Sequence, residues 1–472
     1  MSGAQNASPF RTVSRTSHIA AVPDAVFAWH ERSGALERLI PPWESVQVVE
    51  RSGGFGDGAR LTLRIRQGPL AFRWVAVHRD TIPGRQFVDE QVEGPLAHWI
   101  HTHRMDPAEG GGCRMTDRIE YAPPFGLLGA AAGQWCLTPQ IDRMLRYRHD
   151  VLRGDLAAHG RFADRPPLRV GVTGSHGLVG SALLPFLTTG GHSTVRLVRA
   201  RPGPDDVLWN PATGQIDGGA LSGVDAVVHL AAESIAAGRW TRTQKRRIRE
   251  SRVVGTRRLC ETLARLDSPP RVLISASAVG FYGDRGDEQL IEDSSPGTGF
   301  LADLAGEWEA ATEPARVAGI RVVELRLGVV LSPRGGALRT MLPPFRLGLG
   351  GQLGSGSQWM SWASIDDVIG AIHHLLLSDS IEGPINVVAP EAVTNREFTE
   401  TLGQVLGRPT LLPVPQSVLR VAIGEMADEA LLASARVLPA RLQQSGYQFR
   451  HPSLGTALSH VLGKTEPRAN SS

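Results

Sequence analysis

Hydrophobic and polar residues follow two different patterns in the two parts of this chain. Over the first 160 residues, apolar side chains recur at every second position in several short segments, as in strands that bury one face. Helical spacing covers residues 22–43, where Pro41 and Pro42 end it, and again about 137–158. We therefore expect residues 10–160 to form an α+β domain with a closing helix. The expected strands are residues 10–19 (an edge strand), 46–51, 60–67, 72–82, 86–93, 98–105 and 114–122.

After a linker at residues 163–169 (ADRPPLR), short apolar strands alternate with helical segments, which is typical of an α/β domain. The pattern predicts a domain over residues 168–465, with a small substrate subdomain at about 411–464. A helix is expected over about 241–266, and residues 384–407 should give an edge strand of the subdomain and a helix capped by Thr394 or Asn395. Asp366 and Asp367 precede another helix and are expected to cap it.

The stretch LRVGVTGSHGLVG at 168–180 combines a buried strand, a glycine turn and an apolar helix, the order that opens a dinucleotide-binding fold. Gly174 allows a tight turn, Gly177 lets the backbone approach a pyrophosphate, and Gly180 lets the helix lie close to the sheet. The phosphates would meet N–H groups at a helix N-terminus. An ordinary glycine-rich turn is the alternative for this stretch alone. The cofactor contacts predicted here are Gly174, Ser175, His176, Gly177, Leu178 and Gly180.

The next strand, residues 193–200, ends in Arg199, followed by Arg201, where an acidic residue would hold the ribose 2′-hydroxyl of NAD. Arginine there favours a 2′-phosphate and hence NADP, unless Arg199 is simply a surface residue. After the strand at 224–234, Ala231 and Ala232 are small enough for a cofactor to pass close to the backbone. Glu233 either hydrogen-bonds cofactor or substrate or is a solvated carboxylate. The remaining predicted cofactor contacts are Leu230, Arg239 (alternatively a surface arginine) and Ser275.

Several motifs occur in the order of a known family. TGSHGLVG, DAVVHLAA, ISASAVGFYGD, VELRLGVVL and WASIDDVIGAI resemble the extended short-chain dehydrogenase/reductase family, NAD(P)-dependent epimerases included. WNPATG, HLAAESIAAGRWT and the tail GEMADEALLASARVLPARLQQSGYQFRHPSL resemble its atypical epimerase-like subgroup. Some members of that subgroup carry an SRPBCC (START-like, polyketide-cyclase-like) domain in front, and the element pattern of residues 10–158 resembles one. The resemblance implies an α+β helix-grip domain with an apolar cavity, followed by an α/β doubly wound Rossmann domain.

In that family, a Ser or Thr at the end of the strand at 271–284 acts with a Tyr-x-x-x-Lys pair on the next helix. Ser277 stands at the serine position, but Phe300 and Leu304 stand at the Tyr and Lys positions, and neither can ionise. This departure puts ordinary dehydrogenase or epimerase catalysis in doubt. Tyr282 is the first candidate for a substitute acid, unless it is the aromatic residue of the family's Tyr-Gly turn. Further candidates are Asp303 and Glu233.

Three functions follow as alternatives. The chain is an NADP-dependent oxidoreductase or epimerase-like enzyme acting on a small carbonyl or alcohol, with Ser277 polarising the oxygen, or it is a catalytically silent NADPH-binding sensor or scaffold. In the third, an apolar ligand in the N-terminal cavity, such as a lipid or polyketide, is passed to the second domain. Trp359, Met360 and Trp362 are expected to form an apolar wall near the site, as core packing or as substrate contacts.

Composition and charge limit the kinds of partner that we expect. Hydrophobic residues make up 42% of the 472 residues and charged residues 21%, with a net charge of +3, which is ordinary for a globular protein. The basic segment 239–252 is interpreted as a solvated helix face, so no nucleic-acid partner is expected. Without an apolar run of 18 residues, neither a membrane span nor a secretion signal is predicted, and the protein is expected to be cytoplasmic. The pattern does not predict the oligomeric state.

The spacing of the cysteines and histidines does not predict a metal site. Cys113, Cys136 and Cys260 lie far apart, which gives no zinc motif or disulfide framework. His98, His101 and His103 share one strand, and His101 and His103 point to the same face. Because no acidic residue or third histidine has metal-like spacing nearby, we expect satisfied or surface histidines and no metal site.

Overall fold

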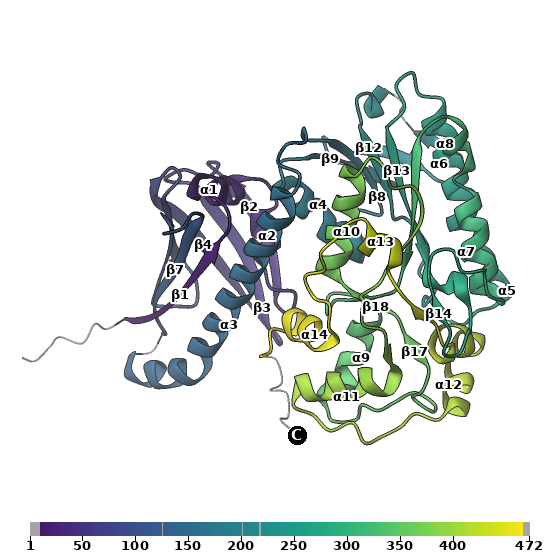
Figure 1. Cartoon of the computed structure of the whole chain (residues 1–472). Coiled ribbons are helices and arrows are strands. Elements are labelled where there is room, and N and C mark those ends of the chain that lie inside the picture. The colour runs from purple at the N-terminus through teal and green to yellow at the C-terminus, as the bar shows by residue number, and fades with distance from the viewer. Residues whose placement is uncertain (1–9, 125, 201, 217–218, 466–472) are drawn as a thin grey trace, which may run out of the picture. The chain divides into compact units, whose positions relative to one another are not determined.

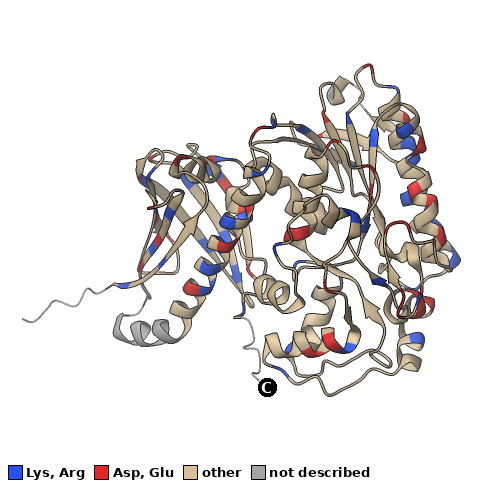
Figure 2. Cartoon of the chain, in the orientation of Figure 1, with Lys and Arg blue, Asp and Glu red and all other residues tan. Residues whose placement is uncertain are grey.

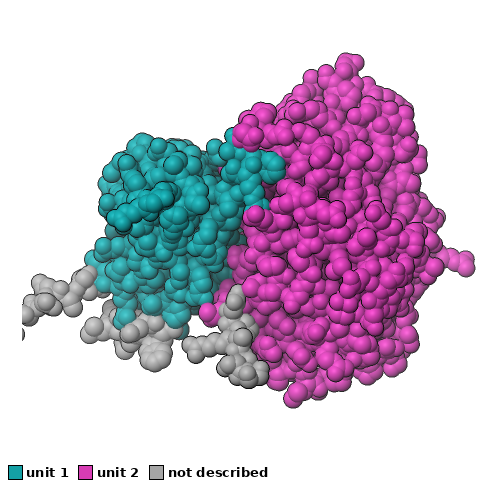
Figure 3. Space-filling view, viewed as in Figure 1, with its two compact units in different colours: residues 1–163 teal, residues 164–472 magenta. Residues whose placement is uncertain are grey.

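A computed structural model describes residues 10–124, 126–200, 202–216 and 219–465 (Figure 1). The chain divides into two compact units on either side of the bond between Ala163 and Asp164 (Figure 3). We call the part before this bond unit 1 and the part after it unit 2. None of the helices in the described residues is long and apolar enough to cross a membrane.

Unit 1 is built on a seven-stranded antiparallel sheet in the order β1-β7-β6-β5-β4-β3-β2. Strand β1 is an edge strand, as the pattern predicts. The elements of this unit are β1 (Arg11–Ile19), α1 (Pro23–Glu31), α2 (Ala35–Leu39), β2 (Ser45–Ser52), β3 (Arg60–Gln67), β4 (Leu70–Ile82), β5 (Gln86–Glu93), β6 (His98–Pro107), β7 (Cys113–Ala122) and α3 (Gly126–Gly160).

The prediction of one helix over residues 22–43 is wrong, because two short helices occupy this segment. Helix α1 ends at Glu31, and α2 begins at Ala35 after Gly34, whose φ of 94° is left-handed and interrupts the helical backbone. The turn lets both helices contribute to one core, in which Val26, Trp29 and Leu39 pack together.

Helix α3 is amphipathic. Charged residues of both signs recur along its coloured part (Figure 2), and Asp142 pairs with Arg146 one turn away at 2.8 Å. Its apolar side packs on the sheet, where Ile141 and Leu145 join Ile119 and Tyr121 of β7. Burial of this face holds the long helix against the strands.

Unit 2 contains an eight-stranded sheet in the order β11-β10-β9-β8-β12-β13-β15-β19. Neighbouring strands are parallel from β10 to β19, and only the β10–β11 hairpin is antiparallel. The sheet runs outward in both directions from β8, which gives the Rossmann-like α/β order with its switch point between β8 and β12. The strands are β8 (Arg169–Thr173), β9 (Ser193–Val198), β10 (Val207–Asn210), β11 (Gln215–Ile216), β12 (Ala226–His229), β13 (Val272–Ala278), β15 (Arg321–Leu327) and β19 (Gly383–Val387).

The helices and short strands of unit 2 complete the fold (Figure 1). They are α4 (Leu178–Thr189), η1 (Gly219–Leu221), α5 (Arg242–Arg249), η2 (Glu250–Val254), α6 (Gly255–Ala264), η3 (Val279–Tyr282), α7 (Phe300–Ala310), α8 (Glu313–Val317), α9 (Gly336–Arg346), α10 (Ile365–Leu377), α11 (Asn395–Leu406), α12 (Gln416–Ile423), η4 (Ala427–Leu432), α13 (Ala440–Gln444) and α14 (Leu454–Leu462), with strands β14 (Gln289–Leu290), β16 (Val329–Leu331), β17 (Trp359–Met360), β18 (Trp362–Ser364), β20 (Val393–Thr394) and β21 (Arg436–Val437).

Three local expectations for unit 2 need correction. The helix expected over 241–266 is divided by the π-helical turn η2. Strand β19 is the edge of the main sheet beside β15, not an edge of the substrate subdomain. Ser364 caps α10 by accepting the Asp367 N–H, so Asp366 and Asp367 are buried first-turn residues rather than caps. The expected cap of α11 is confirmed, because Thr394 and Glu397 form a capping box.

Candidate functional site

The glycine turn between β8 and α4 leaves no room for a side chain at Gly174 or Gly180. Gly174 has a φ of 67°, and a Cβ on it would lie 2.8 Å from the Leu230 carbonyl carbon. A Cβ on Gly180 would lie 2.4 Å from the Gly174 oxygen, so the helix can approach the strand only because both residues are glycine. Gly177 caps α4 with a φ of −73°, which any residue could adopt.

A buried polar network fixes this turn to the neighbouring strand. The Thr173 hydroxyl oxygen accepts the N–H groups of Leu230 and Ala231 at 3.1 and 3.2 Å. It therefore donates its own proton to Nδ1 of His229, 2.8 Å away, and Nε2 of His229 donates to the Thr256 hydroxyl at 3.0 Å. Burial lowers the pKa of His229 to about 4, so the imidazole is neutral and this tautomer ties the ends of β8 and β12 together.

The residues predicted to hold the cofactor surround this switch point. Helix α4 points its N-terminus at the turn, where the first N–H groups of a helix have no partner within the helix. Ser175 is buried, and its hydroxyl lies 3.3 Å from Nδ1 of the exposed His176. Arg199 is exposed directly after β9, the strand beside β8, whereas Arg201 lies outside the described residues. These groups fit the diphosphate and 2′-phosphate of NADP in charge and in position on the sheet.

Two further predicted contacts are partly engaged elsewhere. The Glu233 carboxylate pairs with Arg247 at 2.8 Å, and its backbone carbonyl accepts from Arg252 at 2.9 Å. Arg239 is exposed and lies near Gly424, where an added Cβ would be 3.5 Å from its Nη2 atom. Leu230 and Ala231 are half-buried and Ala232 is exposed, so the end of β12 is open to a ligand.

Much of the positive charge of the basic segment is balanced within unit 2. Lys245, Arg247 and Arg249 pair with Glu425, Glu233 and Glu307 respectively. Arg246 also lies 3.8 Å from Glu250 one turn on.

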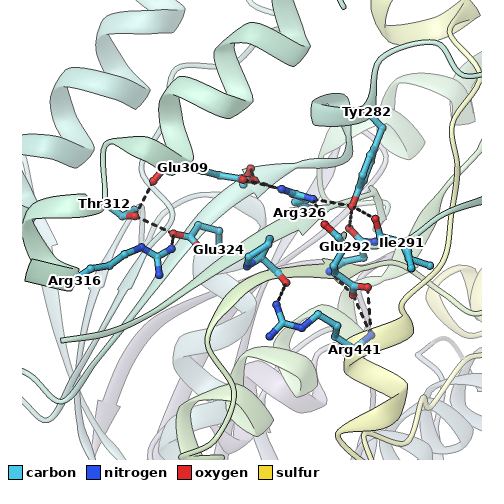
Figure 4. A network of polar contacts seen from close by, with 12 residues as sticks. Tyr282, Ile291, Glu292, Glu309, Thr312, Arg316, Glu324, Arg326 and Arg441 are labelled. Atoms are coloured by element: carbon cyan, nitrogen blue, oxygen red, sulfur yellow. Dashed lines mark hydrogen bonds and ion pairs between the residues drawn. The ribbon is translucent and has the colours of Figure 1, made fainter. Parts of the chain in front are cut away.

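Ser277, at the end of β13, contacts a charged network that includes Glu309 and Arg326, two residues shown in Figure 4. Its hydroxyl donates to Oε1 of Glu309 at 2.7 Å. Arg326 holds the same carboxylate with two hydrogen bonds of 2.9 Å, and its guanidinium lies 3.6 Å from the centre of the Phe281 ring. In this arrangement the Ser277 proton is directed at the carboxylate. Ser275, on the same strand, is fully buried.

Tyr282 is embedded in the same network rather than facing a cleft. Its side chain is completely buried, its hydroxyl accepts from Arg326 at 2.9 Å, and it lies 2.8 Å from Oδ1 of Asn386 and 3.0 Å from the Ile291 carbonyl. Burial raises the pKa of Tyr282 in spite of the nearby Arg326 cation. This geometry disfavours Tyr282 as a proton donor and favours the alternative of a structural aromatic residue at the turn.

The two positions that lack the Tyr/Lys pair are packed by other groups. Phe300 begins α7, its ring centre is 5.1 Å from that of Trp240, and Nζ of Lys245 lies 4.8 Å from its ring centre. Leu304 is buried, and Asp303, the residue before it, is exposed. Trp362 is fully buried as core, whereas Trp359 is half-buried and donates to Asp287 at 2.8 Å.

Glu309, Arg326 and Glu429 were not predicted from the sequence. Glu309 falls on the same helical face as Ala302 and Ala305, which are buried. A carboxylate at a position that helical spacing assigns to the core is the one signal that could have revealed it. Glu429 accepts the N–H groups of Phe300 and Leu301 at 3.0 and 2.8 Å, a contact 128 residues or more away in sequence that no local pattern shows.

Unit 1 contains a second group of titratable side chains. Asp89 of β5 faces His101 of β6 in register, and His103 faces Asp117 of β7. Nδ1 of His103 lies 2.8 Å from Asp117, its Nε2 lies 3.3 Å from Asp89, and Nε2 of His149 from α3 lies 3.1 Å from Asp117. No acidic residue has metal-like spacing near these histidines in the sequence, but sheet register brings two carboxylates to them, and His101 and His103 are buried rather than on the surface.

Charged and neutral histidines lie side by side in this group. Burial acts to lower the pKa of His103, but its attraction to Asp117 and Asp89 outweighs burial and raises the pKa to about 9. Burial, with repulsion from His103, lowers the pKa of His101 and of His30 to about 4 in each case. One imidazolium therefore lies between two carboxylates, and neutral imidazoles lie beside it.

Comparison with known proteins assigns both units. Residues 170–388 match the NAD dependent epimerase/dehydratase family, residues 414–461 match a domain of unknown function (DUF1731), and residues 19–140 match the polyketide cyclase / dehydrase and lipid transport family. A curated relative from Mycobacterium bovis, Epimerase family protein Mb2239, is 46% identical over 293 residues, covering 62% of this chain and 97% of its own.

Two solved structures are similar over different extents. The nucleoside-diphosphate sugar epimerase from Corynebacterium glutamicum has a TM-score of 0.78 and 34% identity, covering 97% of this chain and 91% of its own. The human epimerase family protein SDR39U1, solved with NADPH, has a TM-score of 0.58 and 35% identity, covering 62% of this chain and 99% of its own. The first similarity extends over almost all of this chain, and the second covers a share close to the size of unit 2.

Proposed function

The chain belongs to the NAD dependent epimerase/dehydratase family, joined to an N-terminal domain of the polyketide cyclase type, and from this premise we propose that unit 2 is an NADP(H)-dependent oxidoreductase or epimerase-like enzyme acting on a small carbonyl or alcohol. The observation that carries the proposal is the packing of Gly174 and Gly180 against backbone atoms, which presents the N-terminus of α4 at the switch point.

The preference for NADP rests on Arg199. This residue follows β9 directly, is exposed, and stands where a carboxylate would otherwise accept the ribose hydroxyls of NAD. A guanidinium binds a 2′-phosphate with charge-assisted hydrogen bonds. The presence of NADPH in the human relative's structure supports the same choice.

We propose that Ser277 and Glu309 move the proton in place of the missing Tyr/Lys pair. The bound nicotinamide would supply or accept the hydride. Since Ser277 donates its proton to Glu309, its oxygen is free to accept a proton from a substrate hydroxyl while its own proton passes to the carboxylate. Arg326 positions Glu309 through two hydrogen bonds. Carbonyl reduction would use the reverse transfer.

A catalytically silent NADPH-binding sensor or scaffold is the second candidate. It is favoured because the apolar Phe300 and Leu304 leave no ionisable residue at the family's Tyr and Lys positions, and because Tyr282, the first candidate for a substitute acid, is completely buried. For unit 1 we propose a helix-grip domain that holds a ligand between the sheet and α3. An apolar ligand is in keeping with the family match of that unit.

The decisive experiment measures binding and turnover separately. NADPH and NADH are titrated by fluorescence, and a panel of carbonyls and alcohols is then tested for absorbance change at the nicotinamide band. Gly177→Asp should abolish NADPH binding by placing a carboxylate at the phosphates, and Arg199→Ala should reduce the NADPH preference. Unchanged binding in Gly177→Asp would show that the diphosphate lies elsewhere.

The same panel separates the two candidates. Ser277→Ala and Glu309→Gln should retain NADPH affinity and lose turnover by about 100-fold or more, the usual contribution of a positioned acid or base. Glu307→Gln, an exposed change on the same helix, is the matched control and should be silent. Binding without turnover of any compound would favour the sensor.

A further inference from the structure

The inner face of the unit 1 sheet carries a row of polar side chains that no part of the proposed function uses. His78 of β4, Asp89 of β5 and His101 of β6 lie in register, and two residues along β6 His103 pairs with Asp117 of β7. His101, His103 and Asp117 are 2–3% exposed, and burying such groups costs free energy unless they are paired or bind an ion. A concentrated buried group of this kind is typical of a functional site.

We propose that Asp89, His101 and His103 bind a divalent transition-metal ion, with Zn²⁺ as the reference ion, and that the ion displaces the proton on Nε2 of His103 into solvent. One ligand atom of each residue lies within 4.8 Å of the other two. Ligand atoms on a single Zn²⁺ lie about 3–4 Å apart, so small side-chain adjustments complete the shell. Two imidazoles and one carboxylate form a ligand set that suits Zn²⁺ or Fe²⁺ rather than Mg²⁺, which prefers oxygen ligands.

A second, independent observation concerns a ring nitrogen of His101 that makes no hydrogen bond. Its Nε2 atom is buried and makes no hydrogen bond to any of the residues that the structure describes, and the nearest carboxylate oxygen, on Asp117, is 3.6 Å away. A buried ring nitrogen without a hydrogen bond is costly, and coordination to a metal would satisfy it.

The surroundings supply the outer contacts that metal-binding histidines usually have. Nε2 of His103 faces Asp89, and its Nδ1 lies 2.8 Å from Asp117. The Asp117 carboxylate therefore fixes the orientation of the ring through the nitrogen that does not face the metal site. His78 contacts the other oxygen of Asp89 at 2.9 Å and accordingly fixes that carboxylate. Three protein ligands leave a coordination position open, so the interior of unit 1 would accept water or an oxygen-bearing ligand beside its apolar core.

The test uses the full chain without a histidine tag, treated with a chelator and titrated with Zn²⁺ by calorimetry, with metal content measured after dialysis. We expect binding at unit 1 that is reduced at least tenfold in Asp89→Asn and His101→Gln, and about 10- to 100-fold in Asp117→Asn. His98→Gln is the control on the same strand, and Mg²⁺ is the control ion. His451→Gln removes a member of a separate His/Asp group in unit 2, formed with Asp366 and His460, and tests whether that group contributes.

Retention of binding in His98→Gln and His451→Gln, with loss in the ligand variants, supports the site. If the ligand variants do not fold, as judged by circular dichroism, X-ray absorption at the zinc edge of the His451→Gln chain decides, because that chain lacks the second His/Asp group. A shell with two imidazoles and a carboxylate supports the proposal, and a sulfur-containing or all-oxygen shell overturns it. Absence of Zn²⁺ binding, or binding that the Asp89 and His101 variants leave unchanged, would show that the group is only an internal ion-pair network.

Discussion

His229 shows how one neutral side chain can hold the cofactor turn in place. It accepts from Thr173 and donates to Thr256, and Thr256 also accepts from the indole of Trp308 at 2.9 Å. A second proton on the ring would break the bond from Thr173, because both ring nitrogens would then be donors. The same residue therefore links protonation to the geometry of β8 and β12.

This link predicts a pH dependence of stability. The pKa of His229 is about 4 in the folded chain and about 6.5 when unfolded, so below pH 6.5 the unfolded state binds a proton that the folded state does not. Its contribution is fully present above pH 6.5 and is lost as the pH falls towards 4. Between pH 7.5 and 4.5 the unfolding free energy should fall by about 2–3 kcal/mol more than in His229→Gln. Urea unfolding followed by circular dichroism measures this difference.

The comparison with His229→Gln isolates one group, because the other buried histidines are common to both chains. Parallel pH profiles for the two chains would mean that His229 takes up its proton equally well in the folded state, and the assigned tautomer would be wrong.

At the residue scale, the sequence predicts what a single position requires, such as a glycine or a shared strand face, better than it predicts which side chains contact one another. The φ of Gly174 and the close approach at Gly180 follow from the motif itself. The shared face of His101 and His103 follows from strand periodicity, and their burial on the inner face is consistent with it. Asp89 and Asp117 could not be assigned to the same group, because only the register of β5, β6 and β7 brings them together. For Tyr282 the sequence leaves both a substitute acid and a structural aromatic residue of the turn open, because nothing in it shows that the hydroxyl is enclosed.

At the element scale, the N-terminus of α7 depends on a distant segment. Helix α7 begins after Gly299 without a side-chain cap from its own sequence, and the carboxylate of Glu429 in η4 accepts two of its first N–H groups. The charge also interacts favourably with the helix dipole. Residues 427–432 thereby fix the start of the helix on which Phe300 and Glu309 lie.

We expect Glu429→Gln to destabilise the chain by about 1–2 kcal/mol, because it weakens two charge-assisted hydrogen bonds at a helix N-terminus. Thermal unfolding monitored by circular dichroism measures the effect. Glu425→Gln is the matched control, since Glu425 pairs with the partly exposed Lys245 and such pairs contribute at most about 1 kcal/mol. Equal destabilisation by the two changes would contradict the capping role.

The sequence predicts helices and strands correctly where the residues of the segment itself define them. The expected strands of unit 1 agree with β1 to β7 within two residues at each end, because alternation and turn residues define them directly. The breaks at Gly34 and at η2 were missed, since apolar spacing continues across both and only packing decides that the helix is interrupted. The place of β19 in the main sheet depends on its pairing with β15, which the sequence does not specify.

At the scale of the whole molecule, each unit has its own apolar core. Val26, Trp29 and Met115 belong to the core of unit 1, and Leu197, Val227 and Leu273 belong to that of unit 2. The human relative is matched over 100% of its length by 62% of this chain, and the epimerase and DUF1731 matches both fall in unit 2. Each unit therefore meets the physical requirement for folding as a separate domain.

This organisation predicts that a fragment beginning at Asp164 folds and binds NADPH as the full chain does. All groups assigned to the cofactor, from Gly174 to Ser275, lie within unit 2, so the binding free energies should agree to within about 0.5 kcal/mol, or a factor of about two in Kd. Fluorescence titration of both proteins measures this, with circular dichroism to establish that the fragment is folded. A fragment ending at Ala163 serves as the complementary control and should not bind NADPH. If the folded unit 2 fragment binds NADPH much more weakly, residues of unit 1 must contribute to the cofactor site, because the folded fragment keeps every contact that unit 2 itself provides.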